Sequence, residues 1–245
     1  CEYTVASTSQ MLNPVTGDLD SEILSAIDIP REKFGVMTQP GTVVGVLTEQ
    51  IQEATGLGAI PVIAVAGHDT GSAVAAVPAK DMEYAYLSCG TWSLLGIESD
   101  KAIITEDSFR ENFTNEGGIE GTTRFLKNIC GLWLFEQSRK KFKDAPSSVG
   151  DLVALCEESD YEGLIFPDDP SFANPPSMTA AIREYCRRTG QPAPESPADY
   201  CRCIFRSLAL RYRQVVETLT SMCGFPIRKL HVIGGGSQNK YLMQY

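Results

Sequence analysis

Apolar and polar residues follow a helical pattern most clearly between residues 196 and 224. Ser196 is a favourable N-cap, Pro197 suits the first helical position, and Gly224 ends the pattern. Asp199 falls in the first turn, where an acidic side chain is favoured. One face is apolar and predicts a buried stripe: Tyr200, Ile204, Leu208, Val215, Leu219 and Met222. A helix of this length spans about 40 Å.

Shorter segments also have helical patterns. Residues 21–29 stop before a proline and place Ile23, Leu24 and Ile27 on one face. The segment 48–56 has Thr48 as N-cap and Gly56 as its end. Further helices are predicted at 147–160, where Ser148 and Asp151 have capping-box spacing, at 125–141 and at 177–190. The proline-rich stretch 166–178 is predicted to be a loop.

Strand-like runs alternate with these helices. Residues 60–67, "IPVIAVAG", form a continuous apolar run typical of a strand buried on both faces. The small-residue run 71–78 and the segments 84–88 and 93–98 predict further strands. Residues 229–239 read as a strand, a glycine turn and a helix start. The alternation of strands and helices predicts an α/β fold.

Composition narrows the class of partner. The chain has 245 residues and a formal net charge of −10, with no basic stripe, so we expect no nucleic-acid or membrane partner. No apolar run approaches the length of a membrane span. The first ten residues lack the basic and apolar regions of a secretion signal, and both ends look cut from a longer chain. We therefore expect a cytoplasmic protein.

The eight cysteines and two histidines do not form a zinc-binding pattern, because no Cys-x-x-Cys pair is present. A structural metal is therefore not expected. Cys130, Cys156 and Cys223 have apolar neighbours and are predicted to be small core residues with free thiols.

The triplet His68-Asp69-Thr70 follows the apolar run 60–67. Ligands of α/β folds bind beyond the carboxyl ends of strands, and an aspartate there can accept a hydroxyl proton during phosphoryl transfer. His68 and Thr70 could hydrogen-bond a polyol. The structural alternative is that Asp69 caps a helix starting at Thr70 while His68 is a satisfied core residue.

Two turns have the small residues that suit a nucleotide. Gly234, Gly235 and Gly236 allow close approach of a ligand to the backbone, although Asn239 breaks the dinucleotide-binding spacing and a simple tight turn is the alternative. The turn 87–93, "LSCGTWS", could face a phosphate through Thr91, or could be a hairpin whose Thr and Ser satisfy their own backbone. Trp92 is predicted to be a core residue.

Three stretches, "GHDTGSAVAAVP", "YLSCGTWSLLGIE" and "LHVIGGGSQN", resemble the FGGY carbohydrate kinases in order and spacing, as do "ASTSQMLNPVTGDLD" and "TNEGGIEGTTRFLKNICGLWL". The closest resemblance is to the subfamily of L-rhamnulose kinases. It implies an actin-like, ribonuclease H-like fold, with residues 1–77 ending the first, sugar-binding domain. Residues 78–245 would form most of the second, ATP-binding domain.

The resemblance implies ATP-dependent phosphorylation of L-rhamnulose at its 1-hydroxyl, with Mg²⁺. By motif, Asp69 is the catalytic base, and His68, Thr70 and Asn128 contact the sugar. The family's first phosphate loop, an Asp-x-Gly, is absent from this chain. We therefore expect these residues to need a missing N-terminal part for a complete site, and the isolated chain to be weakly active or inactive.

On the nucleotide side, the resemblance assigns Thr91 to the phosphate turn and Gly234–Gly236 to the adenosine. Glu136 stands where a glutamine is expected. Cys186 and Cys203 fall where relatives can place a cysteine pair, but free thiols are expected in an intracellular kinase. Two alternatives stay open: a sister kinase acting on another ketose or polyol such as L-fuculose or xylulose, and a non-catalytic sugar- or nucleotide-binding module on the same fold.

Overall fold

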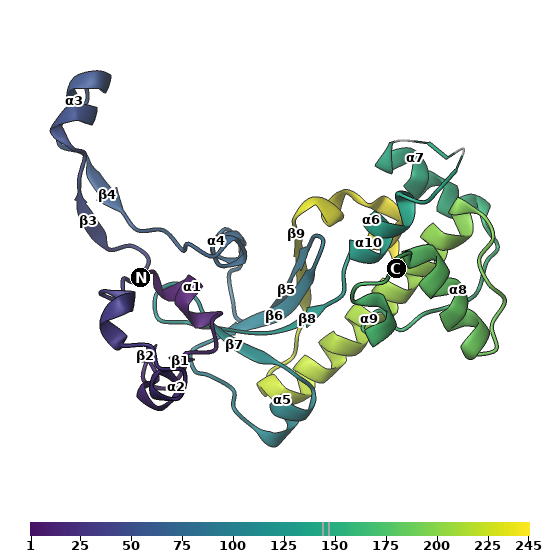
Figure 1. The fold of residues 1–245 in the computed structure, drawn as a ribbon, viewed down its shortest axis with the longest axis horizontal. Helices are drawn as coiled ribbons and strands as arrows, with labels where there is room; N and C mark the ends of the chain where they lie inside the picture. The colour runs from purple at the N-terminus through teal and green to yellow at the C-terminus, as the bar shows by residue number, and fades with distance from the viewer. Residues whose placement is uncertain (144, 147) are drawn as a thin grey trace. The chain divides into compact units, whose positions relative to one another are not determined.

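The computed structural model of the chain describes residues 1–143, 145–146 and 148–245. The chain forms two compact units. Unit 1 contains Cys1–Met82 and Ile97–Leu126, and unit 2 contains Glu83–Gly96 and Lys127–Tyr245. Helices and strands are mixed in both, which confirms the α/β prediction (Figure 1).

The elements of unit 1 are short. Its helices and 3-10 turn are α1 (Tyr3–Ser7), α2 (Ser21–Ala26), η1 (Arg31–Phe34), α3 (Glu49–Thr55), α4 (Asp69–Ala75) and α5 (Glu106–Arg110). Its strands are β1 (Leu12–Asn13), β2 (Asp18–Leu19), β3 (Val43–Val46), β4 (Pro61–Ile63) and β7 (Thr114–Gly117). A small core forms around Ala6, Leu12, Leu19 and Leu24. Helix α2 is as predicted, but only Leu24 of its apolar face is buried, and Ile23 and Ile27 are exposed.

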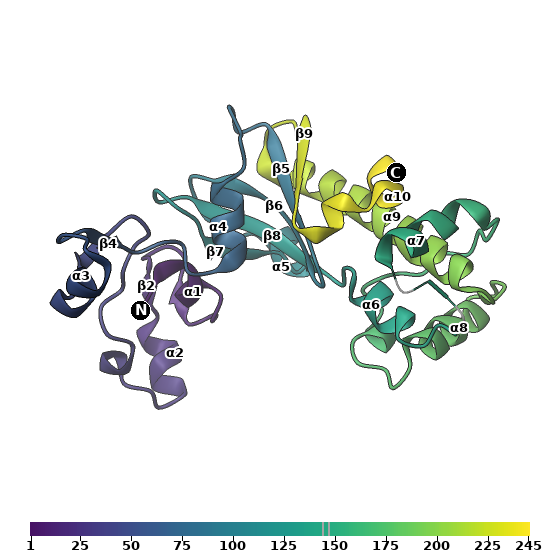
Figure 2. The same ribbon diagram turned by 90° about the horizontal axis from the view of Figure 1, so that it is seen from above.

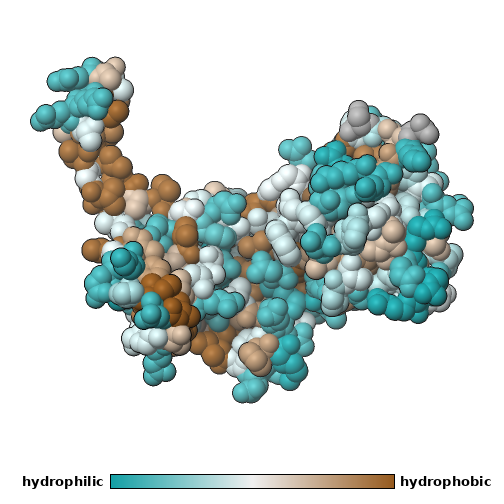
Figure 3. All heavy atoms as spheres, in the orientation of Figure 1, coloured by the Kyte–Doolittle hydropathy of each residue, from teal (hydrophilic) through white to brown (hydrophobic). Residues whose placement is uncertain are grey.

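Strands β3 and β4 form an antiparallel ribbon that carries α3 at its tip (Figure 1). Helix α3 begins after Thr48 and ends at Gly56, which has a left-handed backbone, as predicted. The prediction of a strand buried on both faces at 60–67 is wrong. Strand β4 has three residues, all exposed, because its one partner in the described chain is β3. The ribbon presents an apolar surface between the polar tip and the rest of unit 1 (Figure 3).

The segment after the His-Asp-Thr triplet is a helix, and the strand predicted at 71–78 is wrong. Helix α4 has His68 as its N-cap residue and packs Thr70, Gly71 and Val74 inward. Alanine is a strong helix former, and a run of small residues can also occur in a strand, so the pattern alone does not separate the two. Here the chain forms a helix directly after His68. Asp69 is thus the first residue of the helix, close to the structural alternative that places a helix start at Thr70.

The larger sheet has the strand order β7-β8-β6-β5-β9. Its remaining strands are β5 (Tyr84–Cys89), β6 (Ser93–Ser99), β8 (Thr123–Ile129) and β9 (Lys229–Ile233). Strands β5 and β6 form an antiparallel hairpin, and β9 joins β5 in parallel. The strands predicted at 84–88 and 93–98 and after residue 229 are therefore confirmed.

Unit 2 is organised around α9 (Pro197–Cys223), the long helix predicted from the sequence. Ser196 and Asp199 form a reciprocal capping box, and Gly224 ends the helix with a left-handed backbone. Helices α6 (Trp133–Arg139), α7 (Val149–Ala154) and α10 (Lys240–Gln244) pack on α9, and α8 (Met178–Arg188) packs on α6 (Figure 2). Three 3-10 turns complete the unit: η2 (Leu155–Glu158), η3 (Pro170–Phe172) and η4 (Gly235–Gln238).

The helix predicted at 125–141 is wrong in its first half. Residues 123–129 form strand β8, and α6 begins only at Trp133. A strand buried on both faces followed by a helix gives a run of apolar residues that imitates one long helix. The loop predicted at 166–178 contains the short turn η3, which accommodates Pro170 at its first position.

Two side-chain predictions are also settled. Trp92 is 59% exposed at the hairpin turn and is not a core residue. Cys130 and Cys156 are buried, Cys223 is only half-buried, and Cys186 and Cys203 are free thiols in the core of unit 2. In the described part of the chain, no helix combines the length and the apolar character needed to cross a membrane.

Candidate active site

The turn that carries the triplet is held by the carboxylate of Glu2, which lies near the start of the chain. Oε2 of Glu2 accepts hydrogen bonds from the Gly67 amide at 3.0 Å and from the Thr4 hydroxyl at 2.6 Å. The Thr4 oxygen in turn accepts from the His68 amide at 3.1 Å. A Cβ at Gly67 would lie 2.9 Å from Oε2 of Glu2, so a larger residue here would displace the carboxylate. Glu2 therefore fixes the backbone immediately before Asp69.

The same carboxylate predicts a pH-dependent contribution to stability. Burial raises the pKa of Glu2, but hydrogen bonds from Thr4, Val5 and Gly67 outweigh it, so the pKa is lowered below its usual 4.5. Glu2→Gln should lower the free energy of unfolding by about 1 kcal/mol at pH 7, as for a weakened N-cap. Because the folded pKa is lowered, the wild-type advantage is complete above pH 4.5 and disappears as the pH falls through the folded pKa. Denaturant unfolding of both proteins at pH 7 and pH 3.5 measures it; a constant difference would contradict it.

Asp69 has the most accessible functional group of the triplet. Its side chain is 97% exposed. Oδ1 accepts the Thr70 amide at 2.6 Å and the Thr70 hydroxyl at 3.3 Å, whereas Oδ2 has no hydrogen bond from the described residues. The carboxylate is thus oriented through one oxygen while the other is available to a ligand. Thr70 itself is buried, and its hydroxyl donates to Asp69.

The His68 ring is one-quarter exposed and lies between two charged side chains. Nε2 is 4.0 Å from Oδ1 of Asp69, and Nδ1 is 3.5 Å from Nη2 of Arg124. Arg124 is fully buried, and its Nη2 also lies 3.1 Å from Oε2 of Glu116. His68 is therefore not the satisfied core residue of the structural alternative, because one edge of its ring is accessible.

Asn128, the fourth predicted sugar contact, lies near the end of β8 and is exposed. It belongs to unit 2, whereas His68, Asp69 and Thr70 belong to unit 1. The structure brings those three together within one turn. The role of Asn128 stays a prediction.

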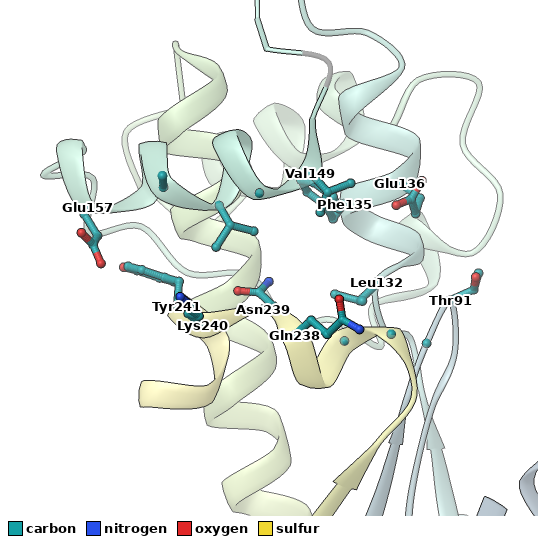
Figure 4. A pocket seen from close by; sticks show the side chains of 16 residues that line it. Thr91, Leu132, Phe135, Glu136, Val149, Glu157, Gln238, Asn239, Lys240 and Tyr241 are labelled. Carbon is teal, nitrogen blue, oxygen red and sulfur yellow. The ribbon is translucent and has the colours of Figure 1, made fainter.

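Unit 2 contains a pocket of about 650 Å³ between the hairpin turn, α6, α7 and the segment from η4 to α10. This volume falls in the range of small-molecule sites. The pocket wall is mostly apolar, with Leu132, Phe135 and Val149, and the polar side chains Gln238 and Asn239 lie along it. In the view of Figure 4, Thr91 lies at one end, and Glu157 and Tyr241 lie at the other.

The three glycines differ in what they do. A Cβ at Gly236 would collide with the side chain of Cys89, and one at Gly234 would lie 2.8 Å from the Cys89 carbonyl oxygen. Gly234 also has a φ of +87°. Both are therefore needed for packing against the end of β5. Gly235 has open space where its Cβ would be and lines the pocket, so it is the glycine best placed for a ligand.

This difference gives a matched pair of variants. Gly236→Ala should lower the free energy of unfolding by about 1–3 kcal/mol, the usual effect of overpacking. Gly235→Ala should change it by less than about 0.5 kcal/mol. In the complete protein it should raise the KM for ATP, the ligand that the resemblance implies for this pocket, severalfold, because the methyl group enters the pocket. Denaturant unfolding and ATP titration of both variants measure this. Equal stability of the two would show that the Cys89 contact does not constrain the turn.

Thr91 and Glu136 both line the pocket, and their contacts with a nucleotide stay a prediction. Thr91 lies in the hairpin turn, which Ser93 anchors through a 2.7 Å hydrogen bond with Tyr212. The segment 87–93 is thus a hairpin turn, as its structural alternative predicted, but the Ser93 hydroxyl bonds to Tyr212 and not to its own backbone. Glu136 accepts a 2.8 Å hydrogen bond from Arg139 one turn later, so part of its carboxylate is engaged within α6.

Several residues of both sites give no local signal in the sequence. Glu2, Glu116 and Arg124 reach the triplet only through the tertiary fold. Gln238 and Tyr241 follow the glycine turn and line the pocket, which their proximity to Gly236 could have indicated.

Comparisons with known proteins agree on one family. Residues 1–76 match the N-terminal domain of the FGGY family of carbohydrate kinases, and residues 85–245 match its C-terminal domain. Rhamnulokinase of Bacteroides thetaiotaomicron is 56% identical over 245 residues, which are all of this chain and 50% of that protein. Rhamnulokinase of Pectobacterium atrosepticum is 48% identical over 246 residues, covering 100% of this chain and 48% of the relative. The chain thus spans about half the length of these curated relatives.

Solved structures give the fold. Xylulose kinase from Rhodospirillum rubrum superposes with a TM-score of 0.67 at 18% identity, over 99% of this chain and 48% of that one. Plasmodium falciparum glycerol kinase with ADP superposes with a TM-score of 0.68 at 17% identity, over the same shares. These matches confirm the predicted actin-like fold.

Proposed function

The chain belongs to the FGGY family of carbohydrate kinases, and from this we propose that the complete protein transfers the γ-phosphoryl group of ATP to the 1-hydroxyl of L-rhamnulose. The observation that carries the proposal is the exposed Asp69 carboxylate, oriented by Thr70 with Oδ2 left open. The rhamnulokinase relatives, at 56% and 48% identity, support the choice of sugar.

Asp69 acts as the general base. Oδ2 accepts the proton of the 1-hydroxyl while the hydroxyl oxygen of the sugar forms a bond to the γ-phosphorus. The bond between that phosphorus and the β,γ-bridging oxygen breaks, and ADP leaves with this oxygen. Most of the catalytic effect in such a transfer comes from positioning and charge stabilisation. The hydrogen bonds of Oδ1 to Thr70 serve this positioning, because they hold the carboxylate in one orientation. His68, Thr70 and Asn128 complete the proposed sugar site.

The pocket of unit 2 is the proposed ATP site. The apolar wall formed by Leu132, Phe135 and Val149 suits the adenine base of ATP. The more polar parts of the nucleotide would lie near Thr91 and the open backbone at Gly235. Glu136 lies beside this wall.

Mg²⁺ enters as part of the MgATP substrate. The described residues contain no group of three His, Cys, Asp or Glu side chains arranged for a metal. In nucleotide sites, Mg²⁺ is usually held mainly by phosphate oxygens and water, with one or two carboxylates. In this proposal, residues 1–77 end the sugar-binding domain and residues 78–245 form most of the ATP-binding domain. The protein would act in the cytoplasm, where ATP is available.

Coupled ADP production by the complete protein tests the proposal. We expect ADP release to depend on sugar, and L-rhamnulose to give the highest kcat/KM in a panel that includes L-fuculose and xylulose. Preference for another ketose would assign the protein to a sister kinase with the same base. ADP release without sugar would indicate an ATPase, and none with any sugar a binding module; either would overturn the proposal.

A further inference from the structure

Arg124 forms a buried junction behind the His68 ring. Its Nε donates to the Gly117 carbonyl oxygen at 3.0 Å, and Nη2 lies 3.1 Å from Oε2 of Glu116. The same Nη2 is 3.5 Å from Nδ1 of His68. Arg124 is 0% exposed and Glu116 is 7% exposed, so water does not compete for these contacts. Within the described chain, Nη1 has no hydrogen-bond partner, so the guanidinium is held by these three groups alone.

This junction determines which nitrogen of His68 carries the proton. A guanidinium has only donors and stays protonated, so the Nδ1 atom that faces it must be the acceptor. A hydrogen on Nδ1 would point at the N–H groups of Arg124. We propose that Arg124 is a positioning residue that holds His68 as the Nε2–H tautomer, so that His68 offers the sugar a hydrogen-bond donor and not an acceptor.

The consequence for the substrate rests on the proposed function. Nε2 lies 4.0 Å from Oδ1 of Asp69, too far for a direct hydrogen bond, so its hydrogen stays available at the exposed edge of the ring. Asp69 can only accept when ionised. The donor and the acceptor therefore stand side by side: Asp69 takes a hydroxyl proton while His68 binds a lone pair of a neighbouring sugar oxygen. A ketose supplies such an oxygen at the carbon next to its 1-hydroxyl.

Glu116 and Gly117 make this arrangement rigid. Glu116 compensates the buried charge, and the Gly117 carbonyl fixes the rotation of the guanidinium about its Nε edge. The backbone of α4 packs against the same group, since a Cβ at Gly71 would lie 3.6 Å from Nη2. Arg124 therefore cannot turn away from His68 without disturbing β7 or α4.

The test is a two-bond ¹H–¹⁵N correlation spectrum of the complete protein with ¹⁵N-labelled histidine, the His68 signals being assigned by their loss in His68→Gln. Arg124→Met combined with Glu116→Met removes the junction and leaves no unpaired buried charge. Arg211→Met is the control, because it removes another buried guanidinium, which pairs with Asp168 at 2.7 Å in unit 2.

We expect the Nε2–H pattern for His68 in the wild type and in Arg211→Met, and a mixture of both tautomers in the double variant. The double variant should raise the KM for L-rhamnulose about tenfold, with a smaller fall in kcat, since a hydrogen bond of defined direction is lost. A purely structural role would lower the active fraction and leave the KM unchanged. An Nδ1–H pattern in the wild type, or an unchanged tautomer and KM in the double variant, would overturn the proposal. If no sugar supports ADP release, the proposed function fails, and the spectrum still decides what Arg124 does.

Discussion

Asp69→Asn should reduce kcat for the proposed ketose by about 10³-fold, within the range for loss of a general base. Asparagine has nearly the same shape and can still accept the Thr70 amide hydrogen bond through Oδ1. It cannot take up the hydroxyl proton. Because the side chain is almost fully exposed, we expect no change in the free energy of unfolding.

The measurement is kcat and KM from coupled ADP production, with unfolding measured on the same preparations. Asp168→Asn is a useful comparison, because that aspartate belongs to unit 2, whereas the triplet belongs to unit 1, and because it pairs with Arg211. It should lose stability and keep most of its kcat. Full activity in Asp69→Asn would remove Asp69 as the base and leave it as the first residue of α4.

Arg124→Met alone should be the most destabilising single change. It leaves the Glu116 carboxylate buried without its cation, and breaking such a pair typically costs about 3–5 kcal/mol. Adding Glu116→Met should restore most of the lost stability, because the second substitution removes the unpaired charge. Denaturant unfolding of the wild type and of both variants gives the comparison.

Arg187→Met supplies the matched surface control. Arg187 also pairs with a glutamate, Glu184, at 2.6 Å, but both side chains are exposed, so its loss should barely change unfolding. If Arg124→Met and Arg187→Met unfolded alike, the buried pair would not be a determinant of stability. If the double variant were no better than Arg124→Met, the loss would come from packing and not from the unpaired carboxylate.

The elements predicted correctly are those whose signals are local. Helix α9 begins and ends at the residues expected, because Ser196, Asp199 and Gly224 act within one turn of the helix ends. Strands β5 and β6 also lie where the sequence places them, joined by a short turn that contains Gly90. In both cases, the signal that marks the element lies within a few residues of its ends.

The errors arise where burial depends on the tertiary fold. Residues 71–78 are mostly small, so their pattern does not separate strand from helix. The apolar positions of 125–135 belong to a buried strand and then to a helix, and only the break at Gly131, where a Cβ would collide with Ser93, divides them. The exposure of β4 cannot be predicted from its sequence, because an apolar run does not indicate how many strands pair with it.

The candidate site divides in the same way. The triplet can be identified from the sequence because its three residues are consecutive, and the glycine turn because it is continuous in sequence. Arg124, Glu116 and Glu2 were not found, because nothing near them in the chain indicates what they will contact. Charged residues of this kind read as solvent-exposed until the fold buries them.

The long-range hydrogen bonds of Glu2 and Arg124 also affect the order of events during folding. Glu2 and Gly67 are separated by 65 positions, and Arg124 and His68 by 56, so each contact closes a long loop. Loop closure costs entropy before such contacts form, whereas α9 needs only local ones. On refolding, the helical circular dichroism signal should therefore recover before the turn around Asp69 is ordered. A chain between these two stages would have its helices, but His68, Asp69 and Thr70 would not yet be in their native arrangement.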